Sequence, residues 1–147
     1  MSKKTLRIAG ASGFWGDASS ATAQLLTGGT VDFIVYDYLA EITMSIMARA
    51  RSKNPESGYA LDFVTAAMKP NLKDIARQGV KIISNAGGVN PQACAKALRA
   101  VIVEQGLDLQ VACVIGDDLF DQRDQLATQK ICEMYSGDAF PPSDKIA

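Results

Sequence analysis

Four short apolar runs, separated by segments with helical spacing, most constrain the fold of this 147-residue chain. Apolar runs of this length are typical of strands that are buried on both faces of a parallel sheet. Strands that alternate with helices indicate an α/β protein. We therefore predict a Rossmann-like α/β fold, in which a parallel sheet of about four strands has helices on both faces. The expected strands are Leu6–Ala9, Val31–Tyr36, Val80–Ser84 and Leu109–Ile115.

The segments outside these runs carry helix signals. Their apolar residues recur every three or four positions, and glycines end several of them. Asn90 and Pro91 mark a helix start, because Asn caps a helix and Pro fits its first turn. Pro70 predicts a break within the longest segment. We expect helices within residues 18–25, 39–51, 59–78, 91–105 and 119–135, a single α/β domain over residues 1–135, and a loose C-terminal tail over residues 136–147.

The composition excludes several classes of function. The chain has no histidine, which rules out Ser-His-Asp and Cys-His catalytic groups and every His-liganded metal site. Its net charge is −1 without a basic block, so we expect no nucleic-acid partner. No apolar run approaches the roughly 20 residues of a membrane span, and no signal peptide is evident. We expect a cytoplasmic protein without a membrane partner, whose cysteines (Cys94, Cys113 and Cys132) are free thiols.

The loops that follow the expected strands are rich in glycine, asparagine and aspartate. Ligands bind at the carboxyl ends of the strands in an open parallel sheet, so these loops predict a site. Carboxylates there are candidate general acids or bases, with a pKa raised by burial. The candidate catalytic residues are Asp17, Glu41, Asp117 and Asp118. The candidate ligand-binding residues are Gly10, Ser12, Gly13, Trp15, Gly16, Asp37, Tyr38, Asn85, Gly87, Gly88 and Asn90.

These features also have structural interpretations. Glycine and asparagine are common in tight turns that bind nothing. Asp117 and Asp118 are weak candidates for a divalent cation such as Mg²⁺, and capping of the following helix is the favoured interpretation. Trp15 lies between turn glycines, where we expect it to line the cleft or to contact another subunit. The residues alone assign no cofactor.

A dinucleotide-binding turn is the alternative interpretation of the first loop. Gly10, Gly13 and Gly16 follow the first expected strand, and Asp37 lies where an acidic residue would hold a ribose. However, no tyrosine has a lysine four positions later, as short-chain dehydrogenases require. Asp17 is also unfavourable beside a pyrophosphate. The alternative function is therefore an NAD(P)-binding oxidoreductase-like domain, and we expect no productive NAD(P) chemistry from this chain.

Several stretches of the chain resemble the acyclic terpene utilisation (AtuA-like) family. They are GASGFWGD from residue 10, DYLAEITMSIMAR from residue 37, GYALDFV from residue 58, NAGGVNPQACA from residue 85 and GDDL from residue 116. The resemblance covers about residues 6–119. It implies a role in bacterial breakdown of acyclic terpenes such as citronellol and geraniol, which proceeds through acyl-CoA intermediates. It also implies that the chain binds a small acidic or CoA-linked metabolite, with no assigned reaction.

The resemblance also bears on how the chain associates. Members of the family are longer, and their domain continues past the GDDL stretch. Four parallel strands alone leave an edge and an apolar flank uncovered, and such surfaces attract another chain. We therefore expect a homo-oligomer or a complex with a partner subunit. A non-catalytic assembly subunit is the third interpretation of the sequence.

Overall fold

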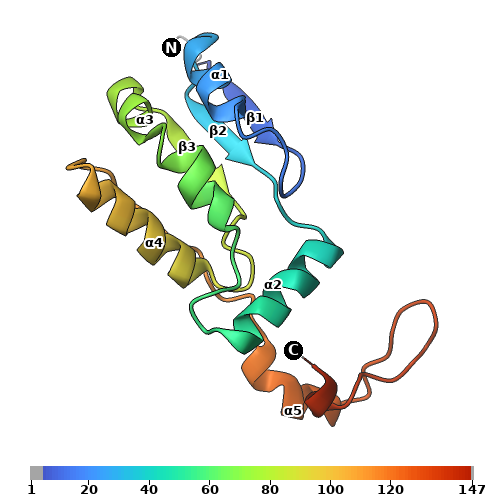
Figure 1. Cartoon of the computed structure of the whole chain (residues 1–147). Helices are drawn as coiled ribbons and strands as arrows, with labels where there is room; N and C mark the ends of the chain where they lie inside the picture. Colours follow the sequence, from blue (N-terminus) through green and yellow to red (C-terminus); the bar gives the residue numbers. More distant parts are fainter. Residues whose placement is uncertain (1–4, 147) are drawn as a thin grey trace. The chain divides into compact units, whose positions relative to one another are not determined.

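The computed structural model, which describes residues 5–146, contains a three-stranded parallel sheet. Residues 1–4 of the expected domain and residue 147 of the expected tail lie outside the described residues. The strands are β1 (Ile8–Ser12), β2 (Phe33–Tyr36) and β3 (Lys81–Ser84), in the order β1-β2-β3 (Figure 1). Three of the four expected strands therefore form, and both pairings are parallel as predicted. The chain is a mixed α/β protein.

The helices largely follow the predicted positions as far as Glu104. They are α1 (Ala21–Thr27), α2 (Glu41–Lys53), the π-helix η1 (Phe63–Met68), α3 (Leu72–Gln78) and α4 (Pro91–Glu104). Asn90 caps α4 as expected, since its side chain accepts a hydrogen bond from the Ala93 amide. Pro70 lies in the turn between η1 and α3, where the predicted break occurs. No helix within residues 5–146 is long and apolar enough to cross a membrane.

Contacts within the chain divide it into two compact units, of which the first ends at Val114 and the second begins at Ile115. The second unit contains the 3₁₀ turn η2 (Phe120–Gln122), α5 (Arg123–Ala127) and the 3₁₀ turn η3 (Ser143–Lys145). Its remaining residues are irregular, apart from one isolated antiparallel bridge between Cys132 and Ala139.

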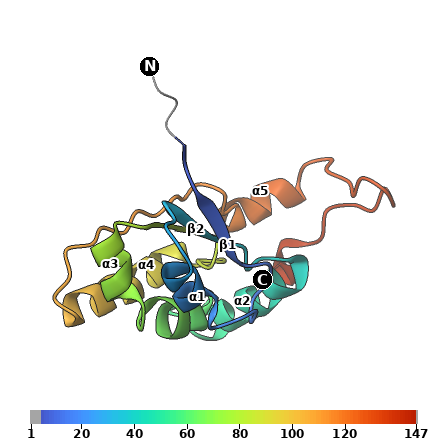
Figure 2. The same ribbon diagram turned by 90° about the horizontal axis from the view of Figure 1, so that it is seen from above.

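One face of the sheet in the first unit is covered by helices and the other is open. Ile34 and Tyr36, on the covered face, are 0% and 3% exposed, whereas Ile8 and Ile83, on the other face, are 66% and 54% exposed. Figures 1 and 2 both show α1 and α3 on one side of the strands, and α1 contacts β1 and η1. The prediction of helices on both faces is therefore wrong. The strand order β1-β2-β3 extends the sheet in one direction only. In such a sheet, right-handed crossover connections put each connecting helix on the same face.

The predicted fourth strand does not form. Residues 107–114 show the burial pattern of a strand, because Leu107, Leu109 and Val111 pack against the core while the residues between them are exposed. The segment nevertheless forms no ladder with β3. Instead, the Val111 carbonyl accepts a hydrogen bond of 2.6 Å from Arg99 of α4. The apolar run indicated an extended segment, but it did not reveal whether the segment pairs, which depends on the neighbouring strand.

The predicted helix over residues 119–135 ends early, at Ala127. Beyond it, the chain turns back on itself, and the Phe140 amide donates to the Ile131 carbonyl at 3.0 Å. The Glu133 carboxylate accepts from the amides of Tyr135 and Ser136 and so closes the turn. The expected loose tail is therefore bonded to the residues that precede it, through contacts between segments that helical periodicity does not reveal.

Close packing explains the glycine pair that follows β3. Gly88 has a φ of +53°, and a Cβ atom there would collide with Met47 Sδ and lie 2.7 Å from the Gly58 carbonyl oxygen. Gly79, which ends α3, has a similar φ of +69° but open space around it. The two positions therefore separate the effect of backbone conformation from the effect of packing.

We predict that Gly88→Ala lowers the free energy of unfolding more than Gly79→Ala does. Both substitutions put a side chain in the left-handed region, at about 1–2 kcal/mol, but only Gly88→Ala also forces overpacking, at roughly 1–3 kcal/mol. Urea unfolding of both variants measures the difference. Equal losses of stability would contradict the packing role assigned to Gly88.

Candidate functional site

The strand β1 ends in a bulge-like register shift at the carboxyl edge of the sheet. The register between β1 and β2 shifts between Gly10 and Ser12, so that Ser12 pairs with Tyr36. Bulges of this kind are enriched next to active sites. The Ser12 hydroxyl is buried and has no hydrogen-bond partner within the described residues. Such groups are rare in folded proteins and need an explanation, of which a bound molecule is one.

The loop after β1 is closed by its own acidic residue. Asp17 accepts hydrogen bonds from the backbone amides of Gly13, at 3.0 Å, and Ala18, at 2.8 Å. These two bonds lower the pKa of the Asp17 carboxyl. The shift is opposite to the raised pKa expected for a general base. Because the carboxylate occupies the amides that would cradle a phosphate, the loop geometry disfavours the dinucleotide interpretation.

Trp15 is held by a residue that the sequence did not suggest. Its indole Nε1 donates a 2.6 Å hydrogen bond to Asp62 Oδ1, and Asp62 lies 47 positions further along the chain. The ring is half-buried and packs against the core, so Trp15 joins the first loop to the start of η1. Asp62 lies between apolar residues in the GYALDFV stretch. A charged residue within such an apolar run is the sequence signal that could have identified Asp62 as a site residue.

The charges of Asp62 and Asp17 both act on Tyr38. Burial raises the pKa of its phenol to about 12, and the negative charges of Asp62 and Asp17 add to the shift. Tyr38 is only 6% exposed as a residue, but its hydroxyl, which makes no hydrogen bond within residues 5–146, is not among the fully buried polar atoms. With a pKa of about 12 the phenol is protonated at neutral pH, so its O–H is a neutral donor.

Three aromatic rings hold this arrangement in place. Tyr36, Tyr38 and Phe63 pack edge-to-face, with centroids 5.3 to 6.1 Å apart. The Tyr36 hydroxyl shares a 2.7 Å hydrogen bond with Thr22 of α1. Phe63 is the first residue of the π-helix η1, a rare structure that is frequently found at functional sites. The rings thus fix Tyr38 relative to Asp62, which directly precedes Phe63.

Asn85 links the ends of β2 and β3. Its Oδ1 accepts from the Tyr38 backbone amide at 2.8 Å, and its Nδ2 donates to Asp37 Oδ1 at 2.7 Å. The structure therefore brings Asp37, Tyr38 and Asn85 together, as the loop positions predicted. Asp37 is exposed and accepts the amide of Asn85 in this structure.

Other predicted residues have structural roles in the same region. Gly87 approaches Pro91 closely, since a Cβ atom on it would lie 2.8 Å from Pro91 Cα. Asn90 caps α4 and donates to the carbonyls of Pro55 and Ser57, which braces the loop after α2. Gly10 lies within β1 rather than in the loop. Gly16 supplies a φ of +91°, and Glu41 is the exposed first residue of α2.

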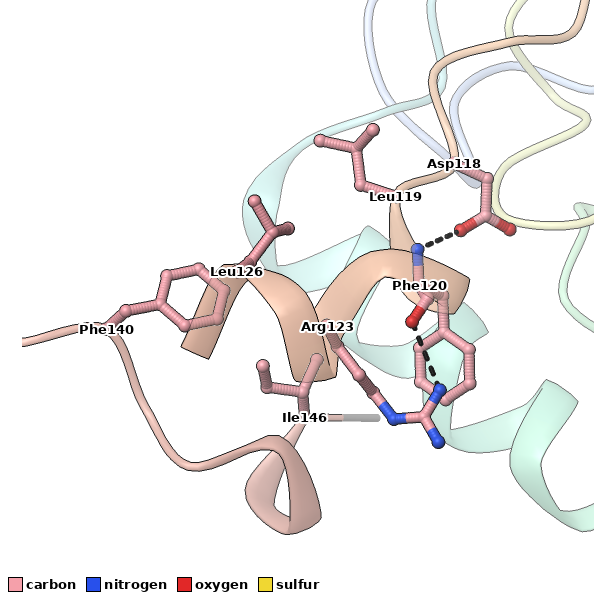
Figure 3. Close-up of a pocket in the computed structure, with 7 residues that line it drawn as sticks. All are labelled: Asp118, Leu119, Phe120, Arg123, Leu126, Phe140 and Ile146. Atoms are coloured by element: carbon pink, nitrogen blue, oxygen red, sulfur yellow. Dashed lines mark hydrogen bonds between the residues drawn. The ribbon is translucent and has the colours of Figure 1, made fainter. Parts of the chain in front are cut away.

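Asp117 and Asp118 belong to the second compact unit. Asp118 accepts a 3.0 Å hydrogen bond from the Phe120 amide, although the cap position of η2 is Leu119 and makes no side-chain hydrogen bond. Asp118 also lines a pocket of about 300 Å³ in that unit (Figure 3). Within residues 5–146, no group of three or more Cys, Asp and Glu side chains could hold a metal ion.

The chemistry of the strand-end site follows from its donors and acceptors. The carboxylates of Asp17, Asp37 and Asp62 bond to backbone amides, Asn85 and Trp15, and to no lysine or arginine of the described residues. The Tyr38 O–H is a neutral donor among them. This arrangement suits a neutral hydroxyl or carbonyl group, whereas a phosphate would face uncompensated negative charge.

Comparison with known proteins agrees with the resemblance seen in the sequence. The model of the family described as acyclic terpene utilisation family protein AtuA matches residues 6–146. This α/β chain therefore belongs to the AtuA family. The match extends to residue 146, beyond the limit near Leu119 that the sequence motifs suggested. No curated protein and no solved structure matches the chain.

We predict that Tyr38 makes the stability of the protein pH-dependent in alkali. Its pKa rises from 10.0 to about 12 on folding, so its contribution to the free energy of unfolding is complete below pH 10 and falls as the pH rises toward 12. Urea unfolding between about pH 8.5 and 11 should show a smaller alkaline loss of stability for Tyr38→Phe than for the wild type.

Burial also raises the pKa of the Cys94 thiol to about 11. This shift adds the same alkaline loss of stability to the wild type and to Tyr38→Phe, so it cancels when the two are compared. Tyr135→Phe is the matched control, because Tyr135 is 88% exposed and its substitution should leave the pH dependence unchanged. An identical alkaline loss in the wild type and Tyr38→Phe would contradict the assignment.

Proposed function

We propose that this chain acts in the cytoplasm in the breakdown of acyclic terpenes such as citronellol and geraniol, by binding a small acidic or CoA-linked metabolite of that route. Membership of the AtuA family supports the metabolic context. We further propose that the first unit is Rossmann-like and that the metabolite binds at the carboxyl ends of its strands.

The observation that carries the proposed site is the Tyr38 hydroxyl, which makes no hydrogen bond within the described residues and lies beside Asp62 and Asp17. In this proposal the hydroxyl donates to the carbonyl or hydroxyl oxygen of the metabolite. Trp15 and the exposed ring of Phe14 offer apolar surface to its hydrocarbon chain. For an acidic or CoA-linked metabolite, the charged part lies away from Asp17 and Asp62, because like charges repel.

The proposal assigns binding and leaves the reaction unassigned. If chemistry occurs there, Tyr38 is the group placed to donate a proton to a carbonyl oxygen, since it is neutral at physiological pH. Asp17 is a poor general base because its pKa is lowered. The NAD(P) alternative is weaker than terpenoid binding, because Asp17 occupies the amides of the glycine-rich loop.

Ligand binding is measured through the single tryptophan of the chain, Trp15. We expect citronellol, geraniol, their acids or the CoA thioesters of those acids to change Trp15 fluorescence and to raise the melting temperature. NADPH and free CoA should do neither. Tyr38→Phe should weaken binding about fivefold, because it removes one hydrogen bond of roughly 1 kcal/mol.

Tyr135→Phe is again the control and should bind as the wild type does. The proposed function is contradicted if none of these terpenoids changes either signal. Equal affinity in Tyr38→Phe and the wild type would remove Tyr38 from the site.

A non-catalytic assembly subunit is the second candidate function, and the open face of the sheet favours it. Ile8 and Ile83 are exposed there, and the Lys81 ammonium lies 5.6 Å from the centre of the Phe33 ring. Exposed apolar surface of this kind often marks an interaction site. We propose that a second copy of the chain or a partner subunit covers this face.

Light scattering at micromolar concentration tests this association. We expect the wild type to be a dimer and Ile83→Lys to be a monomer, because a charge on the face opposes burial. Leu61→Lys is the control, since Leu61 is 60% exposed but lies outside the sheet. A monodisperse, cooperatively unfolding wild-type monomer would show that the open face needs no partner.

A further inference from the structure

The second compact unit contains a pocket of about 300 Å³ that none of the predicted binding residues explains (Figure 3). We propose that this pocket binds an aliphatic monocarboxylate of medium chain length, with Arg123 as the partner of the carboxylate. The hydrocarbon chain lies against the apolar side chains. These are Leu119, Phe120, Leu126, Phe140 and Ile146.

The pocket walls come from segments that the fold of this unit brings together. Leu119 and Phe120 lie at η2, and Leu126 is in α5. Phe140 and Ile146 arrive by the antiparallel return of the chain after residue 131, and α5 contacts η3. Figure 3 shows the side chains of Leu126, Phe140 and Ile146 gathered beside α5. Five of the seven side chains that line the pocket are apolar, which indicates a ligand that is mainly hydrocarbon.

Arg123 supplies the only positive charge among the residues that line the pocket. Its guanidinium lies 4.3 Å from the centre of the Phe120 ring and donates one hydrogen bond, of 3.1 Å, to the Phe120 carbonyl. Five N–H donors are available on a guanidinium. No ion pair joins Arg123 to a carboxylate in the part of the chain that the structure describes. Arg123 is half-buried as a residue, and the spare donors of its guanidinium can bind a carboxylate with two parallel hydrogen bonds.

Asp118 also lines the pocket. Its carboxylate accepts from the Phe120 amide, whereas Arg123 donates to the carbonyl of the same residue, so the two charges engage opposite groups of Phe120 (Figure 3). Arg123 is the single cation among the lining residues, and one guanidinium matches one carboxylate group.

A pocket of about 300 Å³ lies at the small end of the range of ligand sites, which suits a hydrocarbon chain of medium length. The inference uses no residue of the strand-end site and does not depend on the proposed function.

Calorimetric titration of the full chain with decanoate, below its micelle-forming concentration, tests the proposal. We expect decanoate to bind at least tenfold more tightly than decanol, which lacks the charge, and than acetate, which lacks the chain. Arg123→Gln should weaken decanoate binding about tenfold and leave decanol binding unchanged. Arg49→Gln, on the exposed surface of α2, is the matched control and should bind decanoate normally.

Ile146→Asp provides a second variant in the pocket lining and should also weaken decanoate binding by repulsion. Decanoate binding that persists in both variants overturns the proposal, as does a wild type that does not bind decanoate. Decanoate binding that survives in Tyr38→Phe supports a site separate from the strand ends. Weaker binding of citronellol in Tyr38→Phe, with normal decanoate binding, would keep the two proposals distinct.

Discussion

The edge-to-face packing of Tyr36, Tyr38 and Phe63 is the interaction on which the first unit depends most. It joins the end of β2 to the π-helix η1, and through the Tyr36–Thr22 hydrogen bond it also holds α1. Aromatic pairs in this geometry stabilise a protein by about 0.5–1.5 kcal/mol beyond the burial of their area. The same contacts position the phenol of Tyr38 beside Asp62, so that the core and the candidate site share one set of side chains.

The glycine-rich loop after β1 shows how one side chain changes the class of ligand that a loop can accept. Glycine spacing alone is compatible with a phosphate-binding turn. In this chain the Asp17 carboxylate already accepts the hydrogen bonds of Gly13 and Ala18 that a phosphate would need. The negative charge left at the strand ends, together with the neutral Tyr38 donor, favours an uncharged oxygen of a ligand instead.

The two units carry different kinds of surface. In the first, an apolar sheet face with Ile8 and Ile83 is exposed, and the extended segment around Leu109 packs its side chains inward without joining the sheet. In the second, apolar side chains surround a pocket with Arg123 as its cation. Exposed flat apolar surface suits another protein chain, whereas a concave apolar site with one charge suits a small amphiphile.

The sequence by itself determined the strand and helix alternation, the three parallel strands, the break at Pro70 and the cap at Asn90, because these follow from local patterns of a few residues. It also identified the family, through motifs such as NAGGVNPQACA. Only the tertiary structure decided that residues 109–115 stay unpaired, that the last helix ends at Ala127 and that Asp62 meets Trp15. Each of these depends on contacts between residues far apart in the chain, and no periodicity in the sequence records which distant group will be the partner.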